Sequence, residues 1–199
     1  MKKTILIVAL VIFGISNASA QEYWHFGVKG GLNFSTVTGD GFDSPDMRTG
    51  FNVGLLAEIP VSDKFSVQPE VLYSAKGFDA ARMDQDNFLD NDQNVVYQLD
   101  YIDVPVLANI YLTDGLSVQA GPSFNFKVNE QYDYQPYEDG GNINFDKAQD
   151  FELGGAAGLQ YKFNNGLFLQ GRYNYGFTDI YENSNTHNSV IQAGIGYLF

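Results

Sequence analysis

Residues 24–34 read WHFGVKGGLNF, and their larger apolar side chains fall on every second position. Those on the shared face are Trp24, Phe26, Val28, Leu32 and Phe34. Alternation with a period of two places side chains on opposite faces of an extended strand, whereas a helix repeats every 3.6 residues. The stretch therefore predicts a β-strand with one apolar face.

Seven further segments show the same alternation, and they span residues 49–59, 65–76, 95–112, 116–128, 150–163, 167–178 and 187–199. Each is long enough to supply the roughly 9–11 residues that a tilted strand needs to cross a bilayer. Within 95–112 the apolar positions change from odd to even numbers, which predicts a bulge near Tyr101 and Ile102. Pro69, Pro105 and Pro122 lie inside segments and lack a ladder donor, so local bulges or missing bonds are expected there.

The connections between these segments alternate in length. Residues 60–64, 113–115 and 164–166 are short turns, and the last two contain the Asp-Gly and Asn-Gly pairs of tight hairpins. Residues 35–48, 77–94, 129–149 and 179–186 are long polar loops. Short turns at one rim and long loops at the other are typical of outer-membrane barrels, with the short side periplasmic. The pattern predicts an all-β, eight-stranded antiparallel up-and-down transmembrane β-barrel with both termini in the periplasm.

Alternation alone does not decide which face points outward, because a soluble lipocalin-type barrel has its apolar set inside. Aromatic residues near the segment ends favour the membrane barrel, since two aromatic belts mark the two membrane interfaces. On the short-turn side these are Trp24, Phe65, Phe163, Tyr197 and Phe199. On the loop side they are Phe34, Tyr73, Phe126, Tyr175 and Phe177.

The first twenty residues form a separate segment with a signal-peptide pattern. Lys2 and Lys3 precede an apolar run over 4–15, and Ala-Ser-Ala at 18–20 is a small-residue cleavage site. We expect 1–20 to be removed and 21–199 to form the barrel domain. The 199-residue chain has no Cys, which excludes disulfides and a lipoprotein anchor, and a net charge of −13, which disfavours nucleic acid as a partner.

Several short motifs carry a resemblance to a known family. They are QPEVLYSAKG at 68–77, YIDVP at 101–105, AGP at 120–122, RYNYGFTDI at 172–180 and GYLF at 196–199. Together they resemble the PorT-type outer membrane protein beta-barrel domain family of Bacteroidetes, a Gram-negative group. The resemblance implies an eight-stranded barrel of the OmpA/OmpX kind but no shared activity. Asp103 departs from the pattern, because similar sequences carry Glu before Val-Pro.

Opposite charges fall on the inward face of the predicted barrel. They are Lys29, Glu58, Glu70, Lys76, Lys127, Glu152, Lys162 and Arg172. The interior of an eight-stranded barrel is just wide enough for side chains to fill, and a charge there is costly unless it is paired. We therefore interpret these residues as a structural charge network in the lumen. A narrow ion path is the alternative.

Enzymatic and metal-binding patterns are weak. His187, with Asp179, Glu182 and Ser189 nearby, can be written as a hydrolytic triad, but matches of this kind arise easily in Ser- and Asp-rich loops. We therefore predict no enzyme and no cofactor. Four acidic residues are weak candidates for a divalent-cation site, although the Gly and closing Glu of an EF-hand are missing. These are Asp84, Asp86, Asp90 and Asp92.

The functional prediction is a non-enzymatic outer-membrane barrel that serves as a structural or interaction element of the cell envelope. A small passive channel is the first alternative. A surface binding protein is the second, with its four long loops or Tyr132, Tyr134 and Tyr137 contacting an envelope protein or glycan. The expected partners are outer-membrane lipid and the barrel assembly machinery. The ending Ile195, Tyr197, Phe199 resembles the signal that this machinery recognises.

Overall fold

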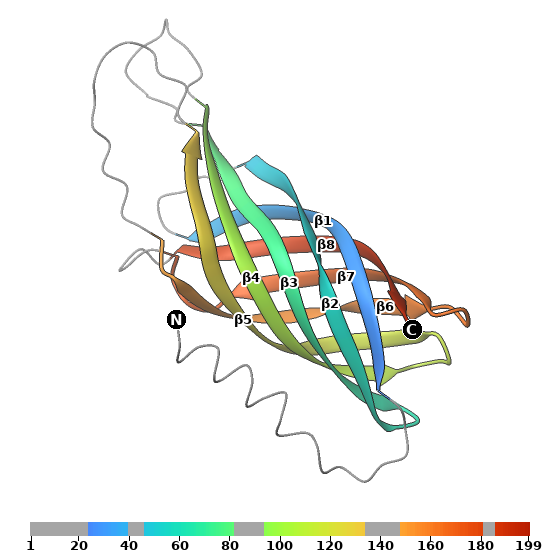
Figure 1. Ribbon diagram of the computed structural model, residues 1–199. Helices are drawn as coiled ribbons and strands as arrows, with labels where there is room; N and C mark the ends of the chain where they lie inside the picture. The colour runs from blue at the N-terminus through green and yellow to red at the C-terminus, as the bar shows by residue number, and fades with distance from the viewer. Residues whose placement is uncertain (1–23, 40–45, 82–93, 134–147, 181–185) are drawn as a thin grey trace, which may run out of the picture.

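The chain forms one closed antiparallel barrel, seen in a computed structural model that describes residues 24–39, 46–81, 94–133, 148–180 and 186–199 (Figure 1). Each strand pairs with its neighbours in sequence, and β8 pairs with β1 to close the sheet. The predicted eight-stranded fold is therefore confirmed. The strands are β1 His25–Gly39, β2 Asp46–Ser62, β3 Phe65–Ala81, β4 Asn94–Tyr111, β5 Leu116–Asp133, β6 Phe151–Lys162, β7 Leu167–Gly176 and β8 Thr186–Leu198.

The apolar face of the sheet points outward and the polar face points inward. Leu55 is 63% exposed, while Leu56, the next residue on β2, is 3% exposed in the interior. Polar residues such as Gln68 and Gln119 are fully buried inside. This arrangement is the reverse of a soluble lipocalin-type barrel, so that alternative is excluded. The described part of the chain has no helix that is long and apolar enough to cross a membrane.

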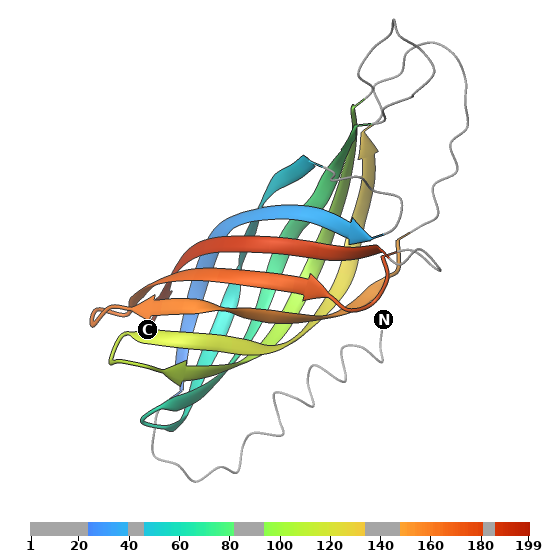
Figure 2. The same ribbon diagram turned by 180° about the vertical axis from the view of Figure 1, so that it is seen from behind.

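The short connections lie together at one end of the barrel. The β6–β7 turn contains Gly166 at φ +88°, a left-handed conformation that glycine adopts without strain, as the Asn-Gly pair predicts. Its backbone is held by a bond from Gly166 N to Phe163 O at 3.1 Å. Leu167 faces Tyr197 on β8, so the C-terminal end lies beside this turn (Figure 2).

Strands β1, β2, β3 and β5 are longer than the sequence pattern predicts, whereas β4 has the predicted length. Residues 35–39, 46–48, 77–81 and 129–133, which were expected in the long loops, continue the strands instead. Their backbones are paired in ladders, and such pairing does not depend on side-chain alternation. As a result β3, β4 and β5 project beyond β6 to β8 at the end opposite the short turns (Figures 1 and 2).

A bulge does occur next to Tyr101, but the extra residue lies on β5 and not on β4, where it was predicted. Asp100 pairs with Asn129 and Tyr101 with Lys127, so the extra residue is Val128 on β5. The β3–β4 register runs through this region without a shift. Leu99 and Tyr101 therefore point inward, where they form an apolar cluster with Val37, Ala148 and Ile180. Burial in this cluster, rather than a bulge in β4, explains why the apolar positions change phase.

The prolines interrupt pairing without shifting it. The ladders skip the pairs Ala57–Pro69, Glu70–Pro105 and Val106–Pro122, and each resumes in unchanged register. A proline has no N–H to donate, so a local gap in the ladder is the expected effect. The prediction of missing bonds is confirmed at these positions.

Candidate functional site

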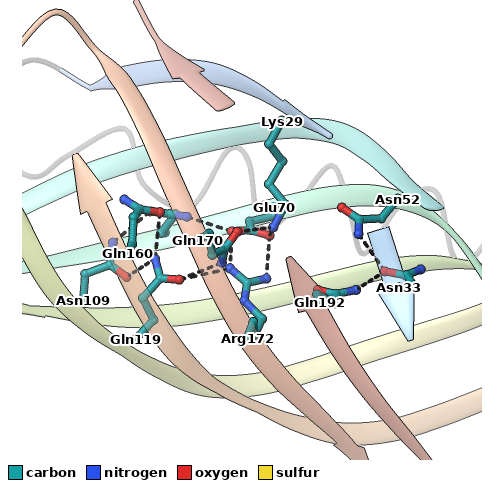
Figure 3. Close-up of polar contacts among 11 residues, drawn as sticks. Lys29, Asn33, Asn52, Glu70, Asn109, Gln119, Gln160, Gln170, Arg172 and Gln192 are labelled. Atoms are coloured by element: carbon teal, nitrogen blue, oxygen red, sulfur yellow. Dashed lines mark hydrogen bonds and ion pairs between the residues drawn. The ribbon is translucent and has the colours of Figure 1, made fainter. Parts of the chain in front are cut away.

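The centre of the barrel interior contains a three-residue ion cluster (Figure 3). Both oxygens of Glu70, on β3, accept from the Arg172 guanidinium of β7, at 2.7 and 2.8 Å. Lys29, on β1, donates to Glu70 Oε2 at 2.8 Å. All three side chains are buried. One carboxylate thus joins three strands across the lumen, and the bidentate geometry is the strong form of an Arg–carboxylate pair.

Amide side chains fill the interior on one side of this ion cluster. Gln119 Nε2 lies 3.0 Å from both Asn109 Oδ1 and Gln160 Oε1. Gln119 Oε1 accepts from Gln170 at 2.7 Å and from Arg172 at 3.3 Å. These contacts continue the polar network toward the short-turn end (Figure 3).

A second amide group occupies the interior on β1, β2 and β8. Asn33 Oδ1 accepts from Asn52 at 2.6 Å and from Gln192 at 3.1 Å. Asn33 Nδ2 donates to Ser74 Oγ at 3.0 Å. Buried polar groups that find partners in this way hold the strands at a fixed height relative to one another.

The short-turn end of the lumen is closed by a charged group and an apolar cluster. Lys162 Nζ is 3.1 Å from Glu58 Oε2, and the Tyr111 hydroxyl donates to Glu58 Oε1. The Lys162 ammonium also lies 5.3 Å from the centre of the Tyr111 ring. The apolar cluster at this end consists of Leu56, Phe168 and Leu198.

The loop end of the lumen is closed by the apolar cluster of Leu99 and Tyr101. Below it, Lys76 Nζ is 2.8 Å from Asp103 Oδ1 and 4.7 Å from the centre of the Tyr101 ring. Ala148 and Ile180, which lie outside the strands, complete the cluster. The described ends of the third and fourth long loops, at Ala148 and Ile180, therefore cover the loop end of the lumen.

Lys127 bonds to the C-terminal end of the third long loop. Its ammonium donates to the Ala148 carbonyl and lies 2.7 Å from Glu130 Oε2 and 3.5 Å from Asp150 Oδ1. The two loop ends are joined by a bond from Gln149 N to Ile180 O at 2.8 Å. The ends of the two loops are thus bonded to each other through the backbone, and the third loop is bonded to β5 through the Lys127 side chain.

The eight charged residues singled out in the sequence all face the interior, but they form separate groups. Lys29, Glu70 and Arg172 meet at the centre, whereas the other pairs lie toward the two ends. Glu152 pairs with no described cation and accepts instead from Asn125 and Asn188. Sequence reasoning did not single out Asp103, the partner of Lys76, although the alternation of apolar residues over 102–110 places it on the inward face.

The other candidates do not assemble into a catalytic or metal site in the described residues. Ser189 Oγ is 3.0 Å from the Tyr173 hydroxyl rather than bonded to His187, whose Nε2 is 3.6 Å from Asp179 Oδ1. No group of three or more metal-ligating His, Cys, Asp or Glu side chains occurs within the described ranges. Some candidates lie outside those ranges, namely Asp84, Asp86, Asp90, Asp92, Tyr134, Tyr137, Glu182 and residues 1–20. Tyr132 is the next-to-last residue of β5, and its side chain is not described.

A closed barrel with an apolar exterior, aromatic ends and a polar interior defines the class of transmembrane β-barrels. Residues 17–182 match the model of the outer membrane protein beta-barrel domain family. The chain belongs to this family, and it is an outer-membrane barrel.

Solved structures share the fold at low sequence identity. Neisserial surface protein A is 13% identical with a TM-score of 0.58, over 89% of this chain and 100% of that one. Ail, the attachment invasion locus protein of Yersinia pestis, is 15% identical with a TM-score of 0.50, over 89% and 100% of the two chains. No curated protein matches this chain.

Proposed function

We propose that this protein is a non-enzymatic, non-conducting barrel that serves as a structural or interaction element of the outer membrane. The observation that carries this proposal is the filled lumen. The Glu70–Arg172 pair crosses its centre, buried amides continue from it, and apolar clusters close both described ends. An interior filled in this way stabilises the barrel and leaves little room for ions to pass.

Planar-bilayer conductance tests this proposal against the passive channel. The refolded wild-type barrel is expected to give no steady current in potassium chloride. Reproducible single-channel steps from the wild type would overturn it in favour of the channel. A heat-unfolded sample of the same preparation controls for leaks caused by detergent or aggregates.

We further propose that the short turns and both termini face the periplasm and that the long loops face outward. The arrangement of short and long connections supports this orientation, as in other outer-membrane barrels. An epitope placed in the 113–115 turn is expected to be hidden in intact cells and accessible after permeabilisation. One placed between β1 and β2, within residues 40–45, is expected to be accessible in both. The opposite result for the two epitopes would reverse the orientation.

The C-terminal residues Ile195, Tyr197 and Phe199 are proposed as the signal for the barrel assembly machinery. All three lie on the outward face, at 51%, 42% and 72% exposure. Removal of Phe199 is expected to lower the folded amount in the outer membrane of cells but not the yield of refolding from urea into detergent. An equal loss in both settings would make its role structural.

A second candidate function is binding at the cell surface. One support is the projection of β3, β4 and β5 beyond the other strands. Another is the charge of the segments expected as long loops, 35–48, 77–94, 129–149 and 179–186, which together hold 15 acidic and three basic residues. The Ail structure contains the heparin analogue sucrose octasulfate. A loop charge of −12 favours cationic partners here, because it repels a polyanion. Deletion of 134–147 is expected to reduce whole-cell binding of a cationic protein such as lysozyme.

Membership of the PorT-type group in Bacteroidetes stays a prediction from the motifs.

A further inference from the structure

A small polar cavity lies inside the barrel at its loop end, away from the central ion cluster. It has room for about one water molecule. Its polar lining comes from five strands and consists of Lys76, Ser123, Asn125, Glu152, Asn174 and Asn188. Because Lys76 also contacts the Tyr101 ring, the cavity adjoins the apolar cluster that closes this mouth of the barrel.

Glu152 gives the cavity an unbalanced negative charge. Its side chain is buried, and its two oxygens accept from the neutral amides of Asn125, at 2.6 Å, and Asn188. No Lys, Arg or His nitrogen of the described residues forms an ion pair with it. A buried carboxylate without a counter-charge is costly, even when it accepts hydrogen bonds.

The other charges near the cavity are already matched. The Lys76 ammonium is 2.8 Å from Asp103, so this pair adds little net charge to the lining. At the next inward level, Arg172 is bound to Glu70. The excess charge of the cavity is therefore that of Glu152.

Two further features shape the cavity around this carboxylate. The Nδ2 atom of Asn174 is buried with no hydrogen-bond partner, and a half-turn of this amide presents its oxygen instead. Gly176 leaves the space that Glu152 occupies, because a Cβ there would lie 3.0 Å from the Glu152 carboxyl carbon. The cavity thus combines one carboxylate with neutral oxygen donors.

This donor set selects a class of ligand. Divalent cations such as Ca²⁺ are usually held by several carboxylates among 6–8 oxygens, and the described residues contain no such group. A single carboxylate with hydroxyl and amide oxygens balances one positive charge. We propose that the cavity at Glu152 binds one small monovalent cation, Na⁺ or K⁺.

Sodium-23 NMR of the refolded full-length mature barrel in detergent micelles tests the proposal. In sodium chloride the wild type is expected to broaden the sodium line beyond empty micelles, and added potassium chloride is expected to remove the excess, whereas choline chloride at the same concentration is not. No excess broadening by the wild type, or equal displacement by choline, would overturn the proposal. This arm needs no variant.

Glu152→Gln keeps the size and hydrogen-bonding capacity of the side chain and removes its charge. The variant is expected to lose the excess linewidth and to unfold in urea at the same midpoint in sodium and choline chloride, while the wild-type midpoint is higher in sodium. Asp114→Asn, at an exposed turn on the opposite rim, controls for the loss of one negative charge and is expected to behave as the wild type. Retention of the broadening in Glu152→Gln would overturn the assignment.

Discussion

The Arg172 guanidinium and the Glu70 carboxylate form a bidentate pair at 2.7 and 2.8 Å across the barrel interior, between strands β7 and β3, which are not neighbours in the sheet. Lys29 completes the cluster from β1. The backbone ladders join only adjacent strands, so contacts of this kind are what connect opposite walls of the barrel. These ion pairs make the lumen a polar core that connects β1, β3 and β7.

Truncation of Arg172 tests the structural importance of this core. Arg172→Ala leaves Glu70 with Lys29 as its remaining cation, and loss of one partner of a buried pair costs about 3–5 kcal/mol of unfolding free energy. Urea unfolding in lipid vesicles measures this loss. Arg48→Ala, at the loop rim, is the control and is expected to cost less. Raised bilayer conductance without lost stability would show instead that Arg172 blocks an ion path.

Packing at the short-turn end predicts a contrast between two glycines. A Cβ at Gly196 would lie 2.2 Å from the Phe168 ring, whereas one at Gly171 meets nothing within 4 Å. Gly196→Ala is therefore expected to destabilise the barrel by about 1–3 kcal/mol, as overpacked cores do. Gly171→Ala is the matched control and is expected to be nearly neutral. Equal unfolding free energies for the two variants would contradict the description of this end of the lumen.

The outward face predicts a dependence on depth in the bilayer. Leu55, which faces Val28 and Val71 in mid-strand, is 63% exposed, and Leu112, beside a short turn, is 59% exposed. Arginine on the lipid face costs about 2–4 kcal/mol at the midplane and about 0–1 near the interface. Leu55→Arg is thus expected to destabilise the barrel in vesicles far more than Leu112→Arg. Similar unfolding free energies for both would place Leu55 outside the hydrocarbon region.

The single tryptophan reports on the position of the short-turn rim. Trp24 is 39% exposed, packs 6.3 Å from the Phe26 ring and belongs to the aromatic belt at this end. Aromatic belts lie at the level of the lipid headgroups. Its fluorescence is therefore expected to be quenched more by bromines near the headgroup than by bromines deep in the acyl chains. Stronger quenching by the deep bromines would show that Trp24 lies in the hydrocarbon region, which would contradict this placement of the short-turn rim.

The sequence predicted the strands and their faces because alternation is a local property. Lys29, Glu70 and Arg172 were assigned to the interior from alternation alone. Their meeting at one height was not predictable, since height depends on the registers around the closed barrel, including Lys29 with Gly196 between β1 and β8.

Leu99 and Tyr101 show the limit of local patterns most clearly. Alternation assigned them to the outward face, whereas the unbroken β3–β4 register turns them inward together with Asp103. Those two residues are apolar because they close the loop end of the lumen against Val37 and Ile180. An apolar cluster inside a mainly polar interior breaks the rule that alternation relies on.

Gel mobility of the outer-membrane fraction tests the central claim, a closed barrel in the outer membrane, most directly. A closed barrel keeps its ladders in detergent until it is heated, so unboiled and boiled samples are expected to migrate at different positions. Recovery of the protein in the soluble periplasm, with the same mobility before and after boiling, would contradict the claim.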